Sequence, residues 1–171
     1  IIGIENNAWG LSTPSDQQFR CAHFTDKAIG YGIPEEDAIQ VDGNDLFAVY
    51  HTVQKCIESL RERPRPIMLE FKTFRVRGHE EASGTKYYPE GLIETWGKVD
   101  PVDRLRAHLQ ASNVLDEATE AAMAQRIKEK IQVGLKAAAA EPQIVASTAE
   151  ELTDRFAAGT PQGSLEVPEA Q

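Results

Sequence analysis

Two polar clusters in this chain contain residue types that can bind a charged ligand. The first is Asn6-Asn7-Ala8-Trp9-Gly10, which follows an apolar run. An amide oxygen and a neighbouring backbone carbonyl are hard ligands, and they suit a Mg²⁺ ion whose charge is largely balanced by a phosphate. The alternative is a simple turn, because Asn tolerates the left-handed conformation and hydrogen-bonds its own backbone. Short motifs often mislead, so the dipeptide alone favours the turn.

The second cluster consists of Arg75, Arg77 and His79 at the end of an apolar run. Strand alternation places all three side chains on the same side for as long as the strand lasts. Three such donors can clamp a diphosphate, and Gly78 allows the backbone to approach it closely. The alternative is a solvated strand end that pairs with the two glutamates that follow, at about 0–1 kcal/mol a pair. The residues of this cluster do not separate the two interpretations.

Apolar periodicity predicts the elements that position these clusters. We expect strands over residues 1–7, 38–41 and 66–74, and helical segments over 17–31, 44–63, 89–98, 100–110, 116–140 and 147–158. The helix over 44–63 has one apolar face, made of Leu46, Val49, Tyr50, Val53, Ile57 and Leu60. A strand, a helix and a strand between residues 38 and 74 form a βαβ unit, which predicts an α/β fold with a parallel sheet flanked by helices.

The start of the chain is unusual. It opens on a β-branched apolar run, Ile1 to Ile4, without a lead-in. Such a run predicts a buried strand, and a buried strand needs neighbours on both sides. We therefore expect that the chain is a fragment cut inside a domain.

Composition excludes several classes of function. A net charge of −9 argues against non-specific nucleic-acid binding, and no apolar stretch approaches the roughly 20 residues that span a bilayer. Cys21 and Cys56 have no metal-site or CxxC spacing, which indicates packing cysteines in a reduced intracellular protein. The remaining histidines, His23, His51 and His108, lie in predicted helices, where we expect packed or exposed side chains instead of catalytic ones.

Several segments taken together resemble one family. "IENNAWGLSTP" resembles the end of the thiamine diphosphate motif of 2-oxo acid dehydrogenase alpha subunits of the pyruvate and branched-chain type, and "DKAIGYGIP", "VDGNDLFAVY", "PIMLEFKTFRVRGHEEASGTKYY" and "KVDPVDRLRAHL" follow in that family's order. The resemblance covers residues 1–145, the carboxyl-terminal part of the alpha domain, and leaves 146–171 as a polar tail or linker. It implies a transketolase-like thiamine diphosphate-binding fold.

The resemblance implies roles for individual residues. Asn7 matches the side chain that ligates Mg²⁺, and Trp9 matches the residue that ligates it through the backbone carbonyl, usually Tyr in the family. Arg75 matches the arginine on the cofactor diphosphate. His79 matches the active-site histidine, which hydrogen-bonds either the diphosphate or a reacting oxygen. Tyr87, or Tyr88 if the loop alignment slips by one, matches the tyrosine that orders the loop over 80–88.

The implied activity is the decarboxylation of a 2-oxo acid and the transfer of its acyl group to the lipoyl group of a dihydrolipoyl acyltransferase. The cofactors are thiamine diphosphate and Mg²⁺, and the implied assembly is a heterotetramer with a beta subunit or beta domain. Two alternatives stay open, namely an acetoin-type dehydrogenase alpha subunit and a non-catalytic module that only binds a beta subunit. Glu80 stands where mitochondrial members carry a phosphorylatable Ser. Similarity to bacterial members favours a cytoplasmic location over the mitochondrial matrix.

The sequence also lacks parts of the family's site. The Gly-Asp-Gly start of the cofactor motif is absent, and the family takes the glutamate that activates the cofactor from the beta subunit. We therefore predict that the 171-residue chain alone neither turns over nor binds the cofactor tightly. Calorimetry with thiamine diphosphate and Mg²⁺ should detect no tight stoichiometric binding, and a sub-micromolar one-to-one isotherm would contradict this.

Overall fold

The computed structural model describes residues 1–155, without the side chain of Ser83. These residues belong to two compact units, one over Ile1–Glu117 and one that begins at Ala118. The first unit contains both polar clusters, and its strands and 3-10 helices place them.

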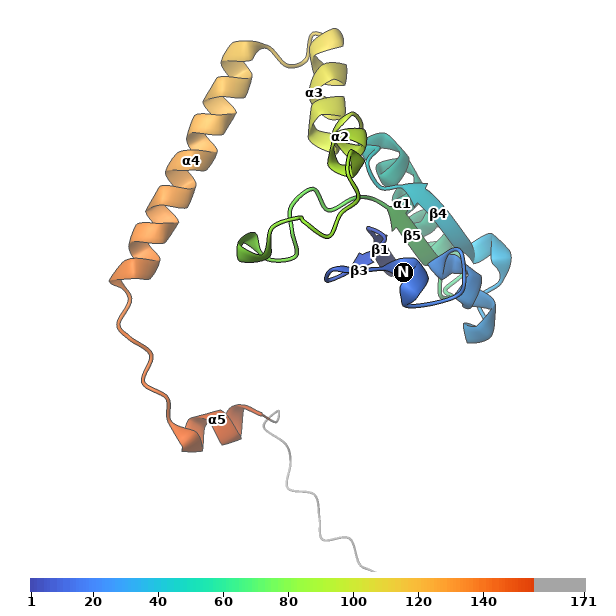
Figure 1. Ribbon diagram of the computed structural model, residues 1–171, viewed down its shortest axis with the longest axis horizontal. Coiled ribbons are helices and arrows are strands. Elements are labelled where there is room, and N and C mark those ends of the chain that lie inside the picture. Colours follow the sequence, from blue (N-terminus) through green and yellow to red (C-terminus); the bar gives the residue numbers. More distant parts are fainter. Residues whose placement is uncertain (156–171) are drawn as a thin grey trace, which may run out of the picture. The chain divides into compact units, whose positions relative to one another are not determined.

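Three parallel strands form the sheet of the first unit (Figure 1). The central strand is β5 (Met68–Lys72), which pairs with β1 (Ile2–Asn6) on one side and β4 (Ala38–Asp42) on the other. Helix α1 (Leu46–Glu62) connects β4 to β5. The predicted βαβ unit and parallel α/β sheet are therefore confirmed.

The two faces of the sheet are covered differently. Met68 packs with Ala28 and Ile33 of the segment around the 3-10 helix η2 (Phe24–Tyr31). On the opposite face, Leu69 packs with Cys56 of α1. Successive residues of β5 thus face opposite layers, as the pleat of a strand requires.

The predicted opening strand is present as β1, and among the described residues it has one neighbour instead of two. β1 pairs with β5 alone and lies at the sheet edge, and Ile1 and Ile2 are about half exposed. The central strand is instead β5, where Leu69 is fully buried.

The segment over 17–31 also differs from the expectation. Its helical part is the 3-10 helix η2, preceded by the short 3-10 helix η1 (Ser15–Gln17) and followed by η3 (Glu35–Asp37). His23 and Asp26 form a capping box at the start of η2, and Gly32 ends it with φ of 74°. The mixed apolar spacing reflects two separate contacts, since Phe19 packs on Phe24 whereas Ala28 packs on the sheet.

Only part of the predicted apolar face of α1 is covered. Val53 and Leu60 pack against the sheet beside the buried Cys56. Leu46, Tyr50 and Ile57 are exposed, and they line a groove of about 520 Å³. The apolar face of α1 is therefore wider than the part of it that packs on the sheet. In the part of the chain that the structure describes, the remaining apolar side chains of this face are exposed to solvent.

Helices α2 (Leu92–Gly97) and α3 (Pro101–Ala111) are tied to the strand ends by buried polar contacts. The Asn44 side chain donates to the Val99 carbonyl at 3.1 Å and accepts from the Thr73 hydroxyl at 2.9 Å. Asp100 caps α3 as expected, with its carboxylate accepting from the amides of Val102 and Asp103. These contacts fix the chain directly after β5.

The second unit is helical in the part that the structure describes. It contains most of α4 (Glu117–Ala140), together with α5 (Thr148–Asp154). The predicted apolar stripe of α4 is exposed at Met123, Ile127, Ile131 and Leu135. The rest of the predicted 146–171 tail, from residue 156, lies outside the described residues, and the boundary at 145 stays a prediction. None of the described helices is long and apolar enough to cross a membrane.

A buried ion pair gives a stability test. Arg65 donates to both carboxylate oxygens of Asp37 at 2.7 Å, and this hydrogen bonding holds the Asp37 pKa below its ordinary value. Because the folded pKa is depressed, the pair stabilises the fold fully above pH of about 3.9, and the contribution is lost as the pH falls through the folded pKa. We expect Asp37→Asn to lower the melting temperature at pH 7, with a smaller difference from wild type at pH 3.

The matched control is Glu81→Gln, which removes an ion pair between two mostly exposed side chains, Arg77 and Glu81. We expect it to leave the melting temperature nearly unchanged, because exposed pairs contribute little. An Asp37→Asn deficit of equal size at both pH values would contradict the assignment.

Candidate functional site

The first polar cluster forms two overlapping side-chain turns at the end of β1. The Asn6 side-chain oxygen accepts from the Ala8 amide, and that of Asn7 accepts from the Trp9 amide, both at 2.9 Å. Ala8 has φ of 63°, in the left-handed region that costs a residue with a side chain roughly 1 kcal/mol or more. The simple-turn alternative is therefore realised. It does not exclude a metal, because an amide oxygen has two lone pairs.

A pocket of about 100 Å³ opens beside this turn. It is lined by Glu5, Asn6, Asn7, Trp9, Gly10, Ser15, Gln18, Phe19 and Phe24. The pocket has room for a small ion and its nearest ligands, and Asn7 and Trp9 contribute to its wall. The turn continues into the short hairpin of β2 (Trp9–Gly10) and β3 (Thr13–Pro14), which fixes where Trp9 lies.

Arg75 joins the two polar clusters. Its Nη2 donates to the Leu11 carbonyl at 2.5 Å, two residues beyond Trp9, and to the Tyr87 hydroxyl at 2.9 Å. Its Nε donates to the Tyr88 hydroxyl at 3.3 Å. β1 and β5 are parallel, with Asn6 opposite Lys72, so the chain segments that follow both strands meet at one edge of the sheet.

The sequence leaves open whether Tyr87 or Tyr88 orders the loop over 80–88. Both tyrosines contact Arg75 and Trp9 in the structure, so these contacts do not separate them. Tyr88 is the buried one, and its hydroxyl donates to the Arg75 carbonyl at 2.8 Å. Their ring centroids lie 5.6 Å and 5.0 Å from that of Trp9. Tyr88 also packs on Phe74, which stacks on Trp96 of α2.

The two tyrosines differ in acidity. Burial raises the pKa of the Tyr88 hydroxyl above its ordinary value. Burial acts in the same direction on Tyr87, but its contacts with Tyr88, the His79 amide and Arg75 outweigh burial and lower the Tyr87 pKa.

His79 lies at the open side of this cluster. Its Nδ1 is 3.3 Å from Arg75 Nη1, and its amide donates to the Tyr87 hydroxyl at 3.2 Å. A guanidinium has no lone pair to accept with, so Nδ1 must be the acceptor and the proton of a neutral imidazole is on Nε2. The exposed edge of His79 thus presents an N–H donor.

Arg77 does not join Arg75 and His79. β5 ends at Lys72, five residues before Arg77, so strand alternation does not extend through this segment. Arg77 is mostly exposed and pairs with Glu81, four residues later in the chain. The structure therefore does not bring the three donors together. Arg77 follows the solvated alternative, and anion binding by Arg75 and His79 stays a prediction.

Gly78 serves the loop in this structure. A Cβ atom at Gly78 would lie 2.2 Å from the Gly84 carbonyl oxygen. Gly78 is expected from the sequence to let the backbone approach a diphosphate. In the structure it instead lets two parts of the same loop, on either side of the 3-10 helix η4 (Glu81–Ser83), approach each other. It brings the residues after His79 back toward the site.

The predicted site residues Asn7, Trp9, Arg75, His79 and Tyr87 therefore gather in one region. Sequence reasoning missed two further members, the Leu11 carbonyl and the fully buried Glu70, whose carboxylate accepts from the Asn6 side chain at 2.6 Å. Of the other histidines, His23 lies 3.0 Å from Lys72 Nζ and His108 packs on Phe47. The described residues contain no cluster of three or more His, Cys, Asp or Glu side chains that could hold a metal.

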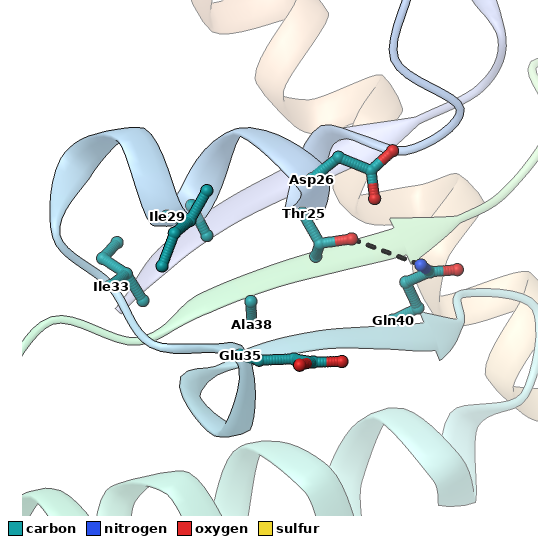
Figure 2. Close-up of a pocket in the computed structure, with 8 residues that line it drawn as sticks. Thr25, Asp26, Ile29, Ile33, Glu35, Ala38 and Gln40 are labelled. Carbon is teal, nitrogen blue, oxygen red and sulfur yellow. Dashed lines mark hydrogen bonds between the residues drawn. The ribbon is translucent and has the colours of Figure 1, made fainter.

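A separate pocket of about 400 Å³ lies between η2 and β4 (Figure 2). It is lined by Thr25, Asp26, Ala28, Ile29, Ile33, Glu35, Ala38 and Gln40, and includes none of the predicted site residues. The Gln40 side chain donates to the Thr25 hydroxyl at 3.2 Å across its floor. The acidic residues at its rim do not favour a phosphate ligand.

Comparison with known proteins decides the family. Residues 1–147 match the model of the dehydrogenase E1 component. The chain belongs to the dehydrogenase E1 component family. The predicted resemblance is thereby confirmed, and the α/β sheet described above is the part of an E1 domain that this chain contains.

Three relatives show how far the similarity reaches. The chain is 37% identical to 2-oxoisovalerate dehydrogenase subunit alpha 2 of Arabidopsis thaliana over 136 residues, or 78% of this chain and 28% of that protein. It is 33% identical to the pyruvate dehydrogenase E1 component subunit alpha of Bacillus subtilis, over 84% of this chain and 38% of that protein. It is 32% identical to 3-methyl-2-oxobutanoate dehydrogenase subunit alpha of Mycobacterium tuberculosis, over 75% of this chain and 34% of that protein. The chain thus spans about a third of these relatives.

Membership of the E1 family implies thiamine diphosphate, and several of the donors described above suit a diphosphate and the metal ion that is predicted to accompany it. Asn7 and the Trp9 carbonyl are neutral oxygens, which is the chemistry expected where phosphate supplies the negative charge. Arg75 and the Nε2–H of His79 are donors suited to phosphate oxygens. Mg²⁺ prefers six oxygens, so further ligands must come from outside this set.

The contacts of Tyr88 give a test of how this E1 segment is held together. Tyr88→Phe keeps the ring but leaves the Arg75 carbonyl without its donor, which should lower the free energy of unfolding by about 1 kcal/mol. Amides of residues 76–86 should also exchange faster with deuterated solvent. Tyr50→Phe, at an exposed position on α1, is the matched control and should change neither measurement. Equal behaviour of the two variants would contradict the role of Tyr88.

Proposed function

We propose that this chain forms part of the E1 alpha component of a thiamine diphosphate-dependent 2-oxo acid dehydrogenase. The observation that carries the proposal is the meeting of the Asn6-Asn7 turn with Arg75 and His79 at the carboxyl end of two parallel strands. Ligands of parallel α/β sheets bind at that edge. The family match supports the proposal independently.

In this proposal the chain's residues bind and orient the cofactor. The Asn7 side-chain oxygen and the Trp9 carbonyl hold Mg²⁺, and Arg75 neutralises the diphosphate. His79 donates through Nε2 to a phosphate oxygen or to a reacting oxygen of the substrate. Tyr87 positions Arg75 and, through the His79 amide, the start of the loop over 80–88. Thiamine diphosphate, when bound, supplies the electron sink through which a 2-oxo acid loses CO₂.

The lipoyl disulfide of a partner acyltransferase would then oxidise the remaining fragment, so that one sulfur receives the acyl group and the other becomes a thiol, and a beta subunit or domain would complete the site. The relatives are alpha subunits of 2-oxoisovalerate and pyruvate dehydrogenases, so we propose pyruvate or a branched 2-oxo acid as substrate. An acetoin-type alpha subunit is the alternative. A cytoplasmic location in a bacterium belongs to the same proposal.

The test uses the full-length protein that contains this chain, assembled with its beta partner. We expect it to bind thiamine diphosphate with Mg²⁺ and to release CO₂ from pyruvate or a branched 2-oxo acid faster than it cleaves acetoin. Faster acetoin cleavage would favour the acetoin-type alternative. Failure to bind the cofactor at all would leave the non-catalytic module.

Arg75→Met and Arg77→Met make a matched pair within that experiment. Arg75→Met removes the proposed diphosphate contact and should weaken cofactor binding at least about tenfold, as the loss of a charge-assisted hydrogen bond does. Arg77 is mostly exposed and pairs with Glu81, so Arg77→Met should leave cofactor affinity near that of wild type. Equal losses in the two variants would contradict the assignment of Arg75.

A further inference from the structure

Glu70 is a charged residue in the most buried part of the sheet. It lies in the middle of β5, between Ile4 of β1 and Gln40 of β4, and its exposure is 0%. Burial of a carboxylate costs free energy unless hydrogen bonds compensate it. Apolar packing alone would favour an aliphatic side chain here, so the hydrogen bonds that Glu70 accepts must account for the carboxylate.

The hydrogen bonds to Glu70 link β1 to η2. Asn6 Nδ2 donates to Oε1 at 2.6 Å. The Thr25 amide and hydroxyl donate to Oε2 at 3.1 Å and 3.3 Å, and Gln40 donates in turn to that hydroxyl (Figure 2). The carboxylate therefore accepts hydrogen bonds from β1 on one oxygen and from η2 on the other.

This arrangement fixes which way round the Asn6 amide lies. An ionised carboxylate only accepts, so the NH₂ group of Asn6 must face Glu70. The Asn6 oxygen then faces the Ala8 amide, which it binds at 2.9 Å. That bond supports the left-handed backbone of Ala8, and the turn at Ala8 sets the positions of Asn7 and Trp9.

We infer that Glu70 is a positioning residue that holds the Asn6-Asn7-Ala8-Trp9 turn in the geometry that presents the Asn7 oxygen and the Trp9 carbonyl to Mg²⁺. It acts through Asn6 and does not touch the metal itself. The inference rests on the proposed function, because it takes this turn as the metal-binding element.

The experiment measures the Mg²⁺ dissociation constant by calorimetry, with MgCl₂ and saturating thiamine diphosphate, in the full-length protein assembled with its beta partner. Glu70→Gln preserves shape but places an NH₂ group against either the Asn6 NH₂ or the Thr25 amide. A reversed Asn6 amide would then lose its bond to Ala8. Loss of an outer positioning contact of this kind weakens metal binding by about tenfold or more, and that is the expected result.

Thr25→Val is the matched control. It removes a hydroxyl that donates to the same carboxylate, but it leaves the Asn6 contact in place. Both variants should lower the melting temperature, whereas we expect Thr25→Val to keep the Mg²⁺ dissociation constant within about twofold of wild type. Equal Mg²⁺ affinities in the two variants would overturn the positioning role and leave Glu70 a purely structural residue.

Two further outcomes are informative. If Glu70→Gln does not fold, Asn6→Ala breaks the same link from the half-buried end and should weaken Mg²⁺ binding to a similar extent, and unchanged Mg²⁺ affinity in that variant would refute the inference. If wild-type protein binds neither cofactor nor Mg²⁺, the proposed function fails, and this inference fails with it. Wild-type binding together with unaltered binding in Glu70→Gln would reject the positioning role alone.

Discussion

Parallel pairing of β1 with β5 is the constraint on which the candidate site depends. The pairing places Asn6 opposite Lys72, so the chain leaves both strands at the same edge of the sheet. The turn after β1 and the segment after β5 are 64 residues apart in sequence, and yet Arg75 reaches the Leu11 carbonyl. An antiparallel pair would direct the two segments to opposite ends of the sheet.

Buried polar contacts then convert this proximity into defined positions. Asn44 ties the chain after β5 to the connection between α2 and α3, and Glu70 ties the turn after β1 to η2. The aromatic rings of Trp9, Tyr87 and Tyr88 close the space between the two segments. The site is thus held from the sheet side by hydrogen bonds and from the loop side by ring packing.

Much of this could be predicted from the sequence, because periodicity and strand order are local signals. The βαβ unit and the Asp100 cap follow from such signals, whereas the grouping of Asn7, Trp9 and Arg75 is implied by the family resemblance alone.

Three features of the structure could not be predicted from the sequence. The end of β5 at Lys72 separates Arg77 from Arg75, and it depends on where the pairing of the strands stops. The role of Glu70 depends on contacts with Asn6 and Thr25, which are distant in sequence. The exposed outer edge of the α1 stripe depends on the width of the sheet that the helix covers.

The hydrogen bonds of Arg75 also bear on which anions the site can select. Four of the five N–H groups of the guanidinium already meet neutral acceptors, namely the Leu11 carbonyl, two tyrosine hydroxyls and His79 Nδ1. An anion that takes any of these four N–H groups must displace a neutral partner, so there it gains only the difference between a charged and a neutral acceptor. A singly charged ion such as chloride or acetate has little advantage in that exchange. A polyanion that meets several donors at once has a large one, and an arginine occupied in this way discriminates against the abundant small anions of the cell.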